Sequence, residues 1–152
     1  MTSIVLVHPE IPHNTGAIGR TCVALDLELV LIRPYGFHLS DRQLKRAGLD
    51  YWQHVRLAEF AGWDAFVAAR KPRSYQLFLF EEYAPRTFYE PEYPDDAFLV
   101  FGSETEGLPR SVTEPLEQRL FRLPMLSDKV RSLNLANTAT AAAYQALRGR
   151  LG

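Results

Sequence analysis

The first polar segment whose residue types suit chemistry spans residues 8–20, which follow an apolar run and lead into a helical pattern. Asn14 and Thr15 can cap the free amides at the start of that helix. Arg20 falls about one turn into the helix, where its planar guanidinium suits a phosphate or a carboxylate. A capped helix with a solvent-exposed arginine explains the same residues. No dinucleotide fingerprint and no Walker lysine motif follows the run, so neither nucleotide-binding class is indicated.

A second polar segment, residues 102–109, follows another apolar run and places acidic side chains between two glycines. Gly102 ends the run, and Gly107 precedes a Leu-Pro step that opens a further helix. Glycines permit close backbone approach, so this loop, with Glu104 inside it, suits packing against a ligand. A plain strand–helix connection, with a glutamate favoured by the helix dipole, is the alternative.

A third polar segment, residues 124–137, leads into a helix rich in alanine and threonine. Ser132 and Asn134 are both candidate caps for that helix. The small residues at 138–143 let the helix approach a neighbouring element closely, which an isolated surface helix does not require. Capping alone and helix propensity alone explain these residues as well.

The composition is typical of a soluble globular protein, with 47% hydrophobic and 23% charged residues. A length of 152 residues predicts one domain, residues 1–152. No apolar run reaches the ~20 residues that a bilayer span needs, and we expect neither a membrane span nor a signal peptide. The single cysteine, Cys22, is predicted to lie buried and unreactive in a cytoplasmic protein.

The charge and the histidines narrow the class of partner. The net charge is −1, so positive charge that meets a nucleic acid must be local or shared between subunits. The four histidines are scattered and have no metal-ligand spacing with the cysteine or with one another. We therefore expect no metal centre.

Short apolar runs that do not alternate with polar residues are typical of strands buried on both faces of a parallel sheet. We expect strands at residues 4–7, 29–32, 77–80 and 98–101, with weaker candidates at 54–57 and 120–123. Helical patterns lie at residues 16–25, 41–47, 63–69, 110–118 and 134–148, and a surface loop is expected at 85–96. This alternation predicts an α/β fold, whose ligands bind beyond the carboxyl ends of the strands.

The three polar segments, in this order and at these intervals, resemble the SPOUT class of RNA 2′-O-ribose methyltransferases. Within that class the chain is similar to bacterial enzymes that modify the wobble nucleotide of tRNA. The likeness covers essentially the whole chain and rests on an ordered set of short motifs, none of them specific alone. These are residues 9–12 before Asn14-Thr15-Gly16, residues 46–51, Gly102-x-Glu104-Thr105-x-Gly107-Leu108-Pro109, and Arg131-Ser132-x-Asn134-Leu135.

The resemblance implies a parallel-sheet α/β/α sandwich with a deep trefoil knot near the C-terminus, a rare topology that residue patterns could not predict. It implies S-adenosylmethionine as the cofactor and a homodimer as the working form. It also implies methylation of a wobble cytidine or modified uridine of tRNA, with leucine tRNAs as substrates. The implied cofactor contacts are Phe80, Gly102, Gly107, Leu123, Ser132 and Leu133.

The resemblance also implies a catalytic set around Arg20, to which the family's proposed proton acceptor maps. A guanidinium with a pKa above about 12 is a poor base, so we expect Arg20 to bind the adjacent phosphate and orient the ribose, with proton abstraction left open. Residues expected to position Arg20 or the ribose are Asn14, Glu104, Ser132 and Asn134. In a dimer, Arg20 of one subunit could serve the cofactor of the other.

The candidate RNA contacts are mostly basic: Arg33, Arg42, Lys45, Arg46, Lys129 and Arg131, together with Tyr144. For residues 42–46 a solvated helix face is the alternative. Glu106 departs from relatives that often carry a basic or neutral residue there, and an acid would weaken any RNA contact at that position. Phosphate contacts give affinity without sequence information, so the choice of nucleotide rests on the resemblance.

Three other interpretations stay open. The enzyme could act at another RNA position, or the chain could be a non-catalytic RNA-binding protein of the same fold. The third is an α/β enzyme for a different phosphorylated or nucleotide substrate. Binding of S-adenosylmethionine separates the first of these from the second.

Overall fold

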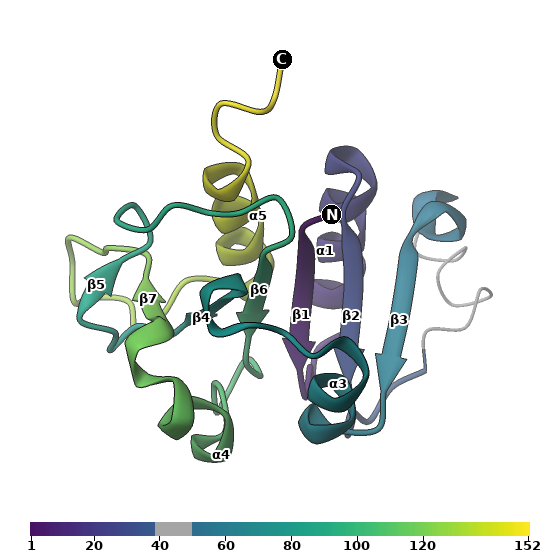
Figure 1. Ribbon diagram of the computed structural model, residues 1–152, viewed down its shortest axis with the longest axis horizontal. Helices are drawn as coiled ribbons and strands as arrows, with labels where there is room; N and C mark the ends of the chain where they lie inside the picture. The colour runs from purple at the N-terminus through teal and green to yellow at the C-terminus, as the bar shows by residue number, and fades with distance from the viewer. Residues whose placement is uncertain (39–49) are drawn as a thin grey trace.

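One parallel sheet organises the molecule (Figure 1). The computed structural model describes residues 1–38 and 50–152. Within these ranges the strands pair in the order β3-β2-β1-β6-β4-β7-β5, and every pairing is parallel. The strands are β1 (Ser3–Val7), β2 (Glu28–Ile32), β3 (Arg56–Phe60), β4 (Leu77–Phe80), β5 (Arg86–Thr87), β6 (Phe98–Phe101) and β7 (Leu120–Arg122).

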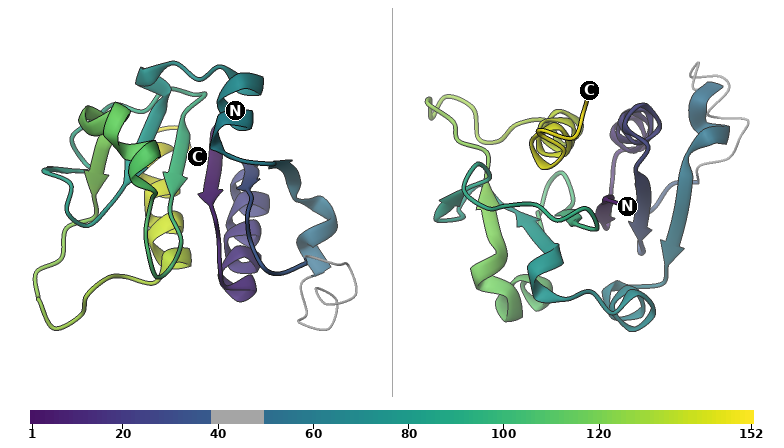
Figure 2. Two further views of the ribbon diagram at one scale, coloured as in Figure 1. Left: turned by 90° about the horizontal axis from the view of Figure 1, so that it is seen from below. Right: turned by 45° about the horizontal axis from the view of Figure 1, so that its top comes forward.

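Helices cover both faces of the sheet, which makes three layers (Figures 1 and 2). The α-helices are α1 (Pro12–Leu25), α3 (Trp63–Arg70), α4 (Arg110–Thr113) and α5 (Leu135–Ala146). The 3₁₀ helices are η1 (Asp50–His54), η2 (Ser74–Gln76) and η3 (Glu114–Arg119). None of the helices in the described ranges is both long and apolar enough to cross a bilayer.

Alternate residues of each central strand face opposite hydrophobic cores, as the continuous apolar runs predict. In β1, Ile4 and Leu6 pack with Ile18 of α1 and with the alanines of α5. Val5 and Val7 point the other way and pack with Phe66 of α3. The prediction of strands buried on both faces of a parallel sheet is therefore confirmed.

The order of the strands reverses direction at one place in the sheet, between β1 and β6. The chain adds β2 and β3 on one side of β1, and the later strands lie on the other side, beginning with β6. Leu6 of β1 lies beside Phe101 of β6 at the carboxyl ends of both strands. Ligands of open α/β sheets bind at such switch points, beyond the carboxyl ends of the strands.

Helices α1 and α5 lie side by side on one face of the sheet (Figure 2). Ala139, Ala142 and Ala143 of α5 are fully buried, and the hydroxyl oxygens of Thr21 and Thr140 lie 2.7 Å apart across the helix pair. Small side chains allow two helices to come this close. The prediction that the alanine- and threonine-rich helix approaches a neighbour is confirmed.

Helix α1 begins at Pro12, four residues before the predicted start at residue 16. A proline suits the first helical position because it has no N–H to leave unpaired. Asn14 and Thr15 consequently lie inside the helix, and the residue before the helix, Ile11, has no side-chain cap. The prediction that Asn14 and Thr15 cap this helix is wrong, and the capping groups come from elsewhere in the chain.

Several other predicted bounds shift in the structure. The strand predicted at 54–57 is β3, Arg56–Phe60, and the strand β5 lies inside the predicted surface loop. The helix predicted at 110–118 divides into α4 and η3, which has a proline in its first turn and non-helical backbone angles at Leu116. The helix predicted at 41–47 lies outside the described residues.

The buried position of Cys22 on α1 agrees with the sequence prediction. Its side chain is fully buried, and this burial raises the pKa of the thiol to about 12. Glu28 contributes to the same shift through its negative charge. Because the thiolate is the reactive form, Cys22 is chemically inert at neutral pH.

Candidate active site

A cavity of about 300 Å³ lies at the carboxyl ends of β4, β6 and β7, against the start of α5. This is the lower end of the sheet in the view of Figure 1. The volume is at the small end of the range for pockets that hold cofactors. The lining combines residues of all three polar segments with residues at the ends of β4, β6 and β7 and in the first turn of α5: Ile11, Asn14, Phe80, Glu81, Glu82, Phe101, Gly102, Ser103, Glu104, Gly107, Leu123, Met125, Ser132, Leu133, Asn134, Leu135 and Thr138.

Two phenylalanines at the strand ends give the cavity an aromatic wall. The rings of Phe80 and Phe101 are stacked, with centroids 4.8 Å apart and planes inclined by 9°. Both residues line the cavity, and both are almost completely buried. A flat apolar surface of this kind suits an aromatic base or another planar group.

The glycines of the second segment let its backbone fold back on itself beside this wall. Ser103 and Gly107 exchange two backbone hydrogen bonds, with N–O distances of 3.2 and 3.0 Å. A Cβ atom at Gly102 would lie only 2.0 Å from the carbonyl carbon of Gly107, so no side chain fits there. Gly107 has φ of 71°, a conformation that favours glycine. Backbone groups rather than side chains therefore form this part of the cavity.

Glu104 supplies the missing cap of α1. Its carboxylate accepts hydrogen bonds from the backbone N–H of Glu10 at 3.0 Å and of Ile11 at 2.6 Å, and from the Asn14 side-chain amide at 3.3 Å. A second pair of hydrogen bonds joins the same two segments. The Glu10 carboxylate accepts one from the backbone N–H of Thr105 at 3.1 Å and one from the Thr105 hydroxyl at 2.7 Å. These bonds fasten the start of α1 to the glycine loop.

We expect Glu104→Gln to lower the free energy of unfolding by about 1–3 kcal/mol, because the amide loses the charge that strengthens three hydrogen bonds. Urea denaturation followed by circular dichroism measures the change. Glu106→Gln is the matched control, since the Glu106 side chain is exposed in the same loop and should change stability by less than about 0.5 kcal/mol. Equal stability of the two variants would contradict the capping role.

Asn14 joins the first polar segment to the third. Its side-chain oxygen accepts a hydrogen bond from the Asn134 amide at 3.2 Å. Asn134 is also the cap of α5, because its side-chain oxygen accepts the N–H of Asn137 at 3.1 Å. The predicted capping role of Asn134 is confirmed, whereas Ser132 lies before the cap and lines the cavity instead.

Arg20 is the predicted site residue that the fold does not bring to this cavity. It is exposed on α1 and does not line the cavity of its own chain. Six residues separate it from Asn14, which corresponds to ~9 Å along a helix. Its guanidinium carbon lies 5.6 Å from the centre of the Tyr51 ring, and the Tyr51 hydroxyl donates to the Gly16 carbonyl oxygen at 2.9 Å. Residue Tyr51 of the 3₁₀ helix η1 therefore contacts both Arg20 and the backbone of α1.

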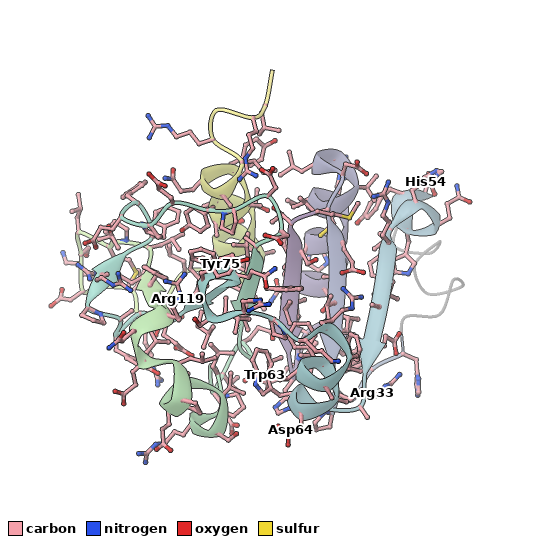
Figure 3. All side chains as sticks on the ribbon, in the orientation of Figure 1. Arg33, His54, Trp63, Asp64, Tyr75 and Arg119 are labelled. Carbon is pink, nitrogen blue, oxygen red and sulfur yellow. The ribbon has the colours of Figure 1, made fainter. Side chains whose placement is uncertain are left out.

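Only some of the residues predicted to contact RNA lie in the described ranges. Lys129 and Arg131 lie on the exposed loop between β7 and α5, and Tyr144 is exposed on α5. Arg33 forms an ion pair with Glu59 at 2.6 Å, at the carboxyl ends of β2 and β3 and away from that loop (Figure 3). Arg42, Lys45 and Arg46 lie outside the described residues. Of the basic residues predicted to contact RNA, Lys129 and Arg131 are therefore the two that the described ranges place on the loop between β7 and α5.

Sequence reasoning missed two acidic residues of the cavity, Glu81 and Glu82. Glu81 accepts the backbone N–H of Leu108 at 2.6 Å. Both residues directly follow the predicted strand at 77–80, so the rule that ligands bind beyond the carboxyl ends of strands could have identified them. Within residues 1–38 and 50–152 no group of His, Cys, Asp and Glu side chains is arranged to hold a metal ion.

The sequence and the fold are similar to those of known RNA methyltransferases. The tRNA (cytidine(34)-2′-O)-methyltransferase of Burkholderia cenocepacia is 44% identical over 150 residues, which cover 97% of this chain and 95% of the relative. A solved structure concerned with the 2-OH methylation of C/U34 on tRNA matches with a TM-score of 0.87 and 43% identity, over 97% of this chain and 95% of that one.

A more distant structure shares the fold. The SpoU methyltransferase AviRb of Streptomyces viridochromogenes, solved in complex with the cofactor AdoMet, has a TM-score of 0.78 and 23% identity, over 97% of this chain and 60% of that one. The model of the SpoU rRNA methylase family matches residues 1–144, nearly the whole chain. By this match, and by relatives above 40% identity along its length, the chain belongs to the SpoU rRNA methylase family.

Proposed function

We propose that this chain is an S-adenosylmethionine-dependent methyltransferase that modifies the ribose 2′-hydroxyl of nucleotide 34, a cytidine or modified uridine, in tRNA. The observation that carries the proposal is the cavity at the carboxyl ends of β4, β6 and β7, built by the motifs that the sequence shares with its relatives. The relatives that are 43–44% identical act on this nucleotide by their own descriptions. Cytoplasmic location and leucine tRNAs as substrates are parts of the same proposal.

The cavity fits the proposed cofactor in shape and chemistry. The stacked Phe80 and Phe101 offer a flat apolar wall for an adenine. Gly102 and Gly107 line the cavity without side chains, so a ligand can approach the backbone closely there. Leu123, Ser132 and Leu133 also line the cavity. We assign these residues to the cofactor because they line one cavity together with residues of the shared sequence motifs.

When bound, S-adenosylmethionine supplies a methyl group already activated by its sulfonium. The protein therefore has to align the ribose hydroxyl with this methyl group and prevent it from binding in unproductive orientations. Arg20 binds the phosphate beside nucleotide 34 and stabilises negative charge on the ribose oxygen. Asn14, Glu104 and Asn134 hold the start of α1 against the cavity, which determines where Arg20 points.

The position of Arg20 supports the proposal of a homodimer. Because Arg20 does not line the cavity of its own chain, we propose that it acts at the cavity of a second copy. Tyr144 on α5 and Ile11 before α1 are large apolar residues that the single chain leaves about half exposed, which suits a contact between these helices of two copies.

Mixing two inactive variants tests this arrangement. Arg20→Ala removes the arginine, and Thr138→Trp fills the cavity from the first turn of α5. Each variant alone should be inactive, whereas a refolded or co-expressed mixture should recover about a quarter of wild-type activity, because each mixed dimer holds one intact site. A mixture that stays inactive while mass measurements show mixed dimers would contradict action across the interface.

We also propose the trefoil knot of the family for the C-terminal third. The segment between β4 and β6 passes around the outside of β7, since β5 pairs with the far edge of β7. The chain after β7 then returns to the sheet face where α5 packs. Tyr93 of the outer segment packs on the same core as α5 and stacks on Phe78 with centroids 4.4 Å apart. These contacts support a threaded C-terminus.

Nucleoside mass spectrometry of tRNA tests the proposed function. Purified protein is incubated with unmodified leucine tRNA and with a second tRNA, using S-adenosylmethionine that carries a labelled methyl group. We expect a labelled 2′-O-methylcytidine or 2′-O-methyluridine at nucleotide 34. A methylated base, or a label at another nucleotide, would overturn the proposal. Absence of cofactor binding in a folded protein would favour the non-catalytic RNA-binding protein.

A further inference from the structure

The charged side chains that line the cavity, among the described residues, are all acidic: Glu81, Glu82 and Glu104. Their surroundings differ. The Glu104 carboxylate accepts hydrogen bonds from three N–H donors at the start of α1, which stabilise its negative charge. Glu82 is exposed to water. Glu81 is only partly exposed, so its charge acts on the cavity through a less polar medium.

The Glu81 carboxylate is only partly compensated within the protein. Its Oε1 atom accepts the Leu108 N–H at 2.6 Å, and the described residues supply no donor to Oε2. Burial raises the pKa of Glu81, the Leu108 N–H opposes the shift, and the neighbouring Glu82 adds to it. Burial therefore disfavours the ionised form of Glu81, and a cation placed beside it lowers that cost.

Methyl transfer changes the charge of the occupant. The bond between the sulfonium sulfur and the methyl carbon breaks, a bond from that carbon to the ribose oxygen forms, and the hydroxyl proton passes to water. The positively charged sulfonium becomes a neutral thioether in S-adenosylhomocysteine. A carboxylate that faces the cavity interacts with the first compound through a charge and with the second only through dipoles.

We propose that Glu81 makes the cavity discriminate by charge, favouring the methyl donor over the demethylated by-product. The inference rests on the proposed function and adds a specificity-determining residue to it. We therefore expect S-adenosylhomocysteine to dissociate more readily than S-adenosylmethionine, although the two compounds have nearly the same shape. The predicted effect is a change in relative affinity rather than in the rate of the chemical step.

Isothermal titration calorimetry with three ligands tests the role of Glu81. The ligands are S-adenosylmethionine, its cationic analogue sinefungin, and neutral S-adenosylhomocysteine. Glu81→Gln keeps the oxygen that accepts the Leu108 N–H but removes the charge. We expect this variant to bind the two cationic ligands about tenfold more weakly, or about 1.4 kcal/mol, and to bind S-adenosylhomocysteine within twofold of wild type.

Two further variants separate charge from structure. Glu82→Gln is the matched control, because Glu82 lines the same cavity but is exposed, and its effect on the affinity ratio should stay below threefold. Glu81→Asp keeps the charge and should retain most of the discrimination, even if all affinities fall. An equal loss for all three ligands in Glu81→Gln, or loss of discrimination in Glu81→Asp, would overturn the inference. Failure of wild-type protein to bind any of the three would overturn the proposed function itself.

Discussion

Replacing Arg20 by alanine is expected to abolish methyl transfer to tRNA, with kcat/KM reduced about 10²–10³-fold or more, while affinity for S-adenosylmethionine stays within a few-fold of wild type. The affinity for S-adenosylmethionine should persist because Arg20 is exposed on α1 and lies outside the cavity that we assign to the cofactor. Losing one preorganised charged donor at a reacting oxygen costs this much in other enzymes. Single-turnover transfer of a labelled methyl group and calorimetry measure the two quantities.

Arg73→Ala is the matched control for Arg20→Ala. Arg73 is an exposed arginine just before η2, at the end of the sheet opposite to the cavity. Its replacement removes one positive charge from the same protein and should leave kcat/KM within twofold. Near-wild-type turnover by Arg20→Ala would refute the assignment of Arg20, and an equal loss in both variants would show that general attraction of RNA explains the effect.

Gly102→Ala is expected to eliminate cofactor binding, with affinity reduced at least about 100-fold, and to destabilise the protein by about 1–3 kcal/mol or more. The added Cβ would lie 2.0 Å from the Gly107 carbonyl carbon and 2.2 Å from the Leu108 nitrogen. Both atoms belong to the backbone, so the collision cannot be relieved by rotating a side chain. The loop must move away from β6, and the cavity wall that it forms moves with it.

Calorimetry with S-adenosylmethionine and thermal unfolding measure the effect of Gly102→Ala. Gly62→Ala is the control, because a Cβ at Gly62 meets no atom within 4 Å and the residue lies before α3, away from the cavity. The control should bind the cofactor normally. A folded Gly102→Ala protein with unchanged affinity would show that the glycine loop does not form the cofactor site.

The central strands could be predicted because burial on both faces leaves an uninterrupted apolar run. β1, β2, β4 and β6 all have this signature and all lie where expected. β5 could not be predicted, since its two residues, Arg86 and Thr87, sit at the sheet edge and carry no apolar pattern. Its position depends on pairing with β7, which is distant in the sequence.

The meeting of the three polar segments could be anticipated because each follows a parallel strand, and parallel strands end at one edge of the sheet. The individual hydrogen bonds between these segments could not be anticipated from the sequence. Glu104 caps α1 from a position 93 residues after Ile11, and local capping rules pointed to Asn14 and Thr15 instead. The contacts of Tyr51 with Arg20 and with the Gly16 carbonyl join η1 to α1, and no local pattern reveals them.

The bond between Glu104 and the start of α1 has a consequence for folding and for local opening. Forming it closes a loop of more than 90 residues, so it adds to the entropic barrier of folding and comes late relative to local helix formation. During synthesis, the first amides of α1 emerge from the ribosome long before their acceptor. In the finished protein, hydrogen exchange at Glu10 and Ile11 should therefore report opening of the glycine loop rather than fraying of the helix to which Ile11 is attached.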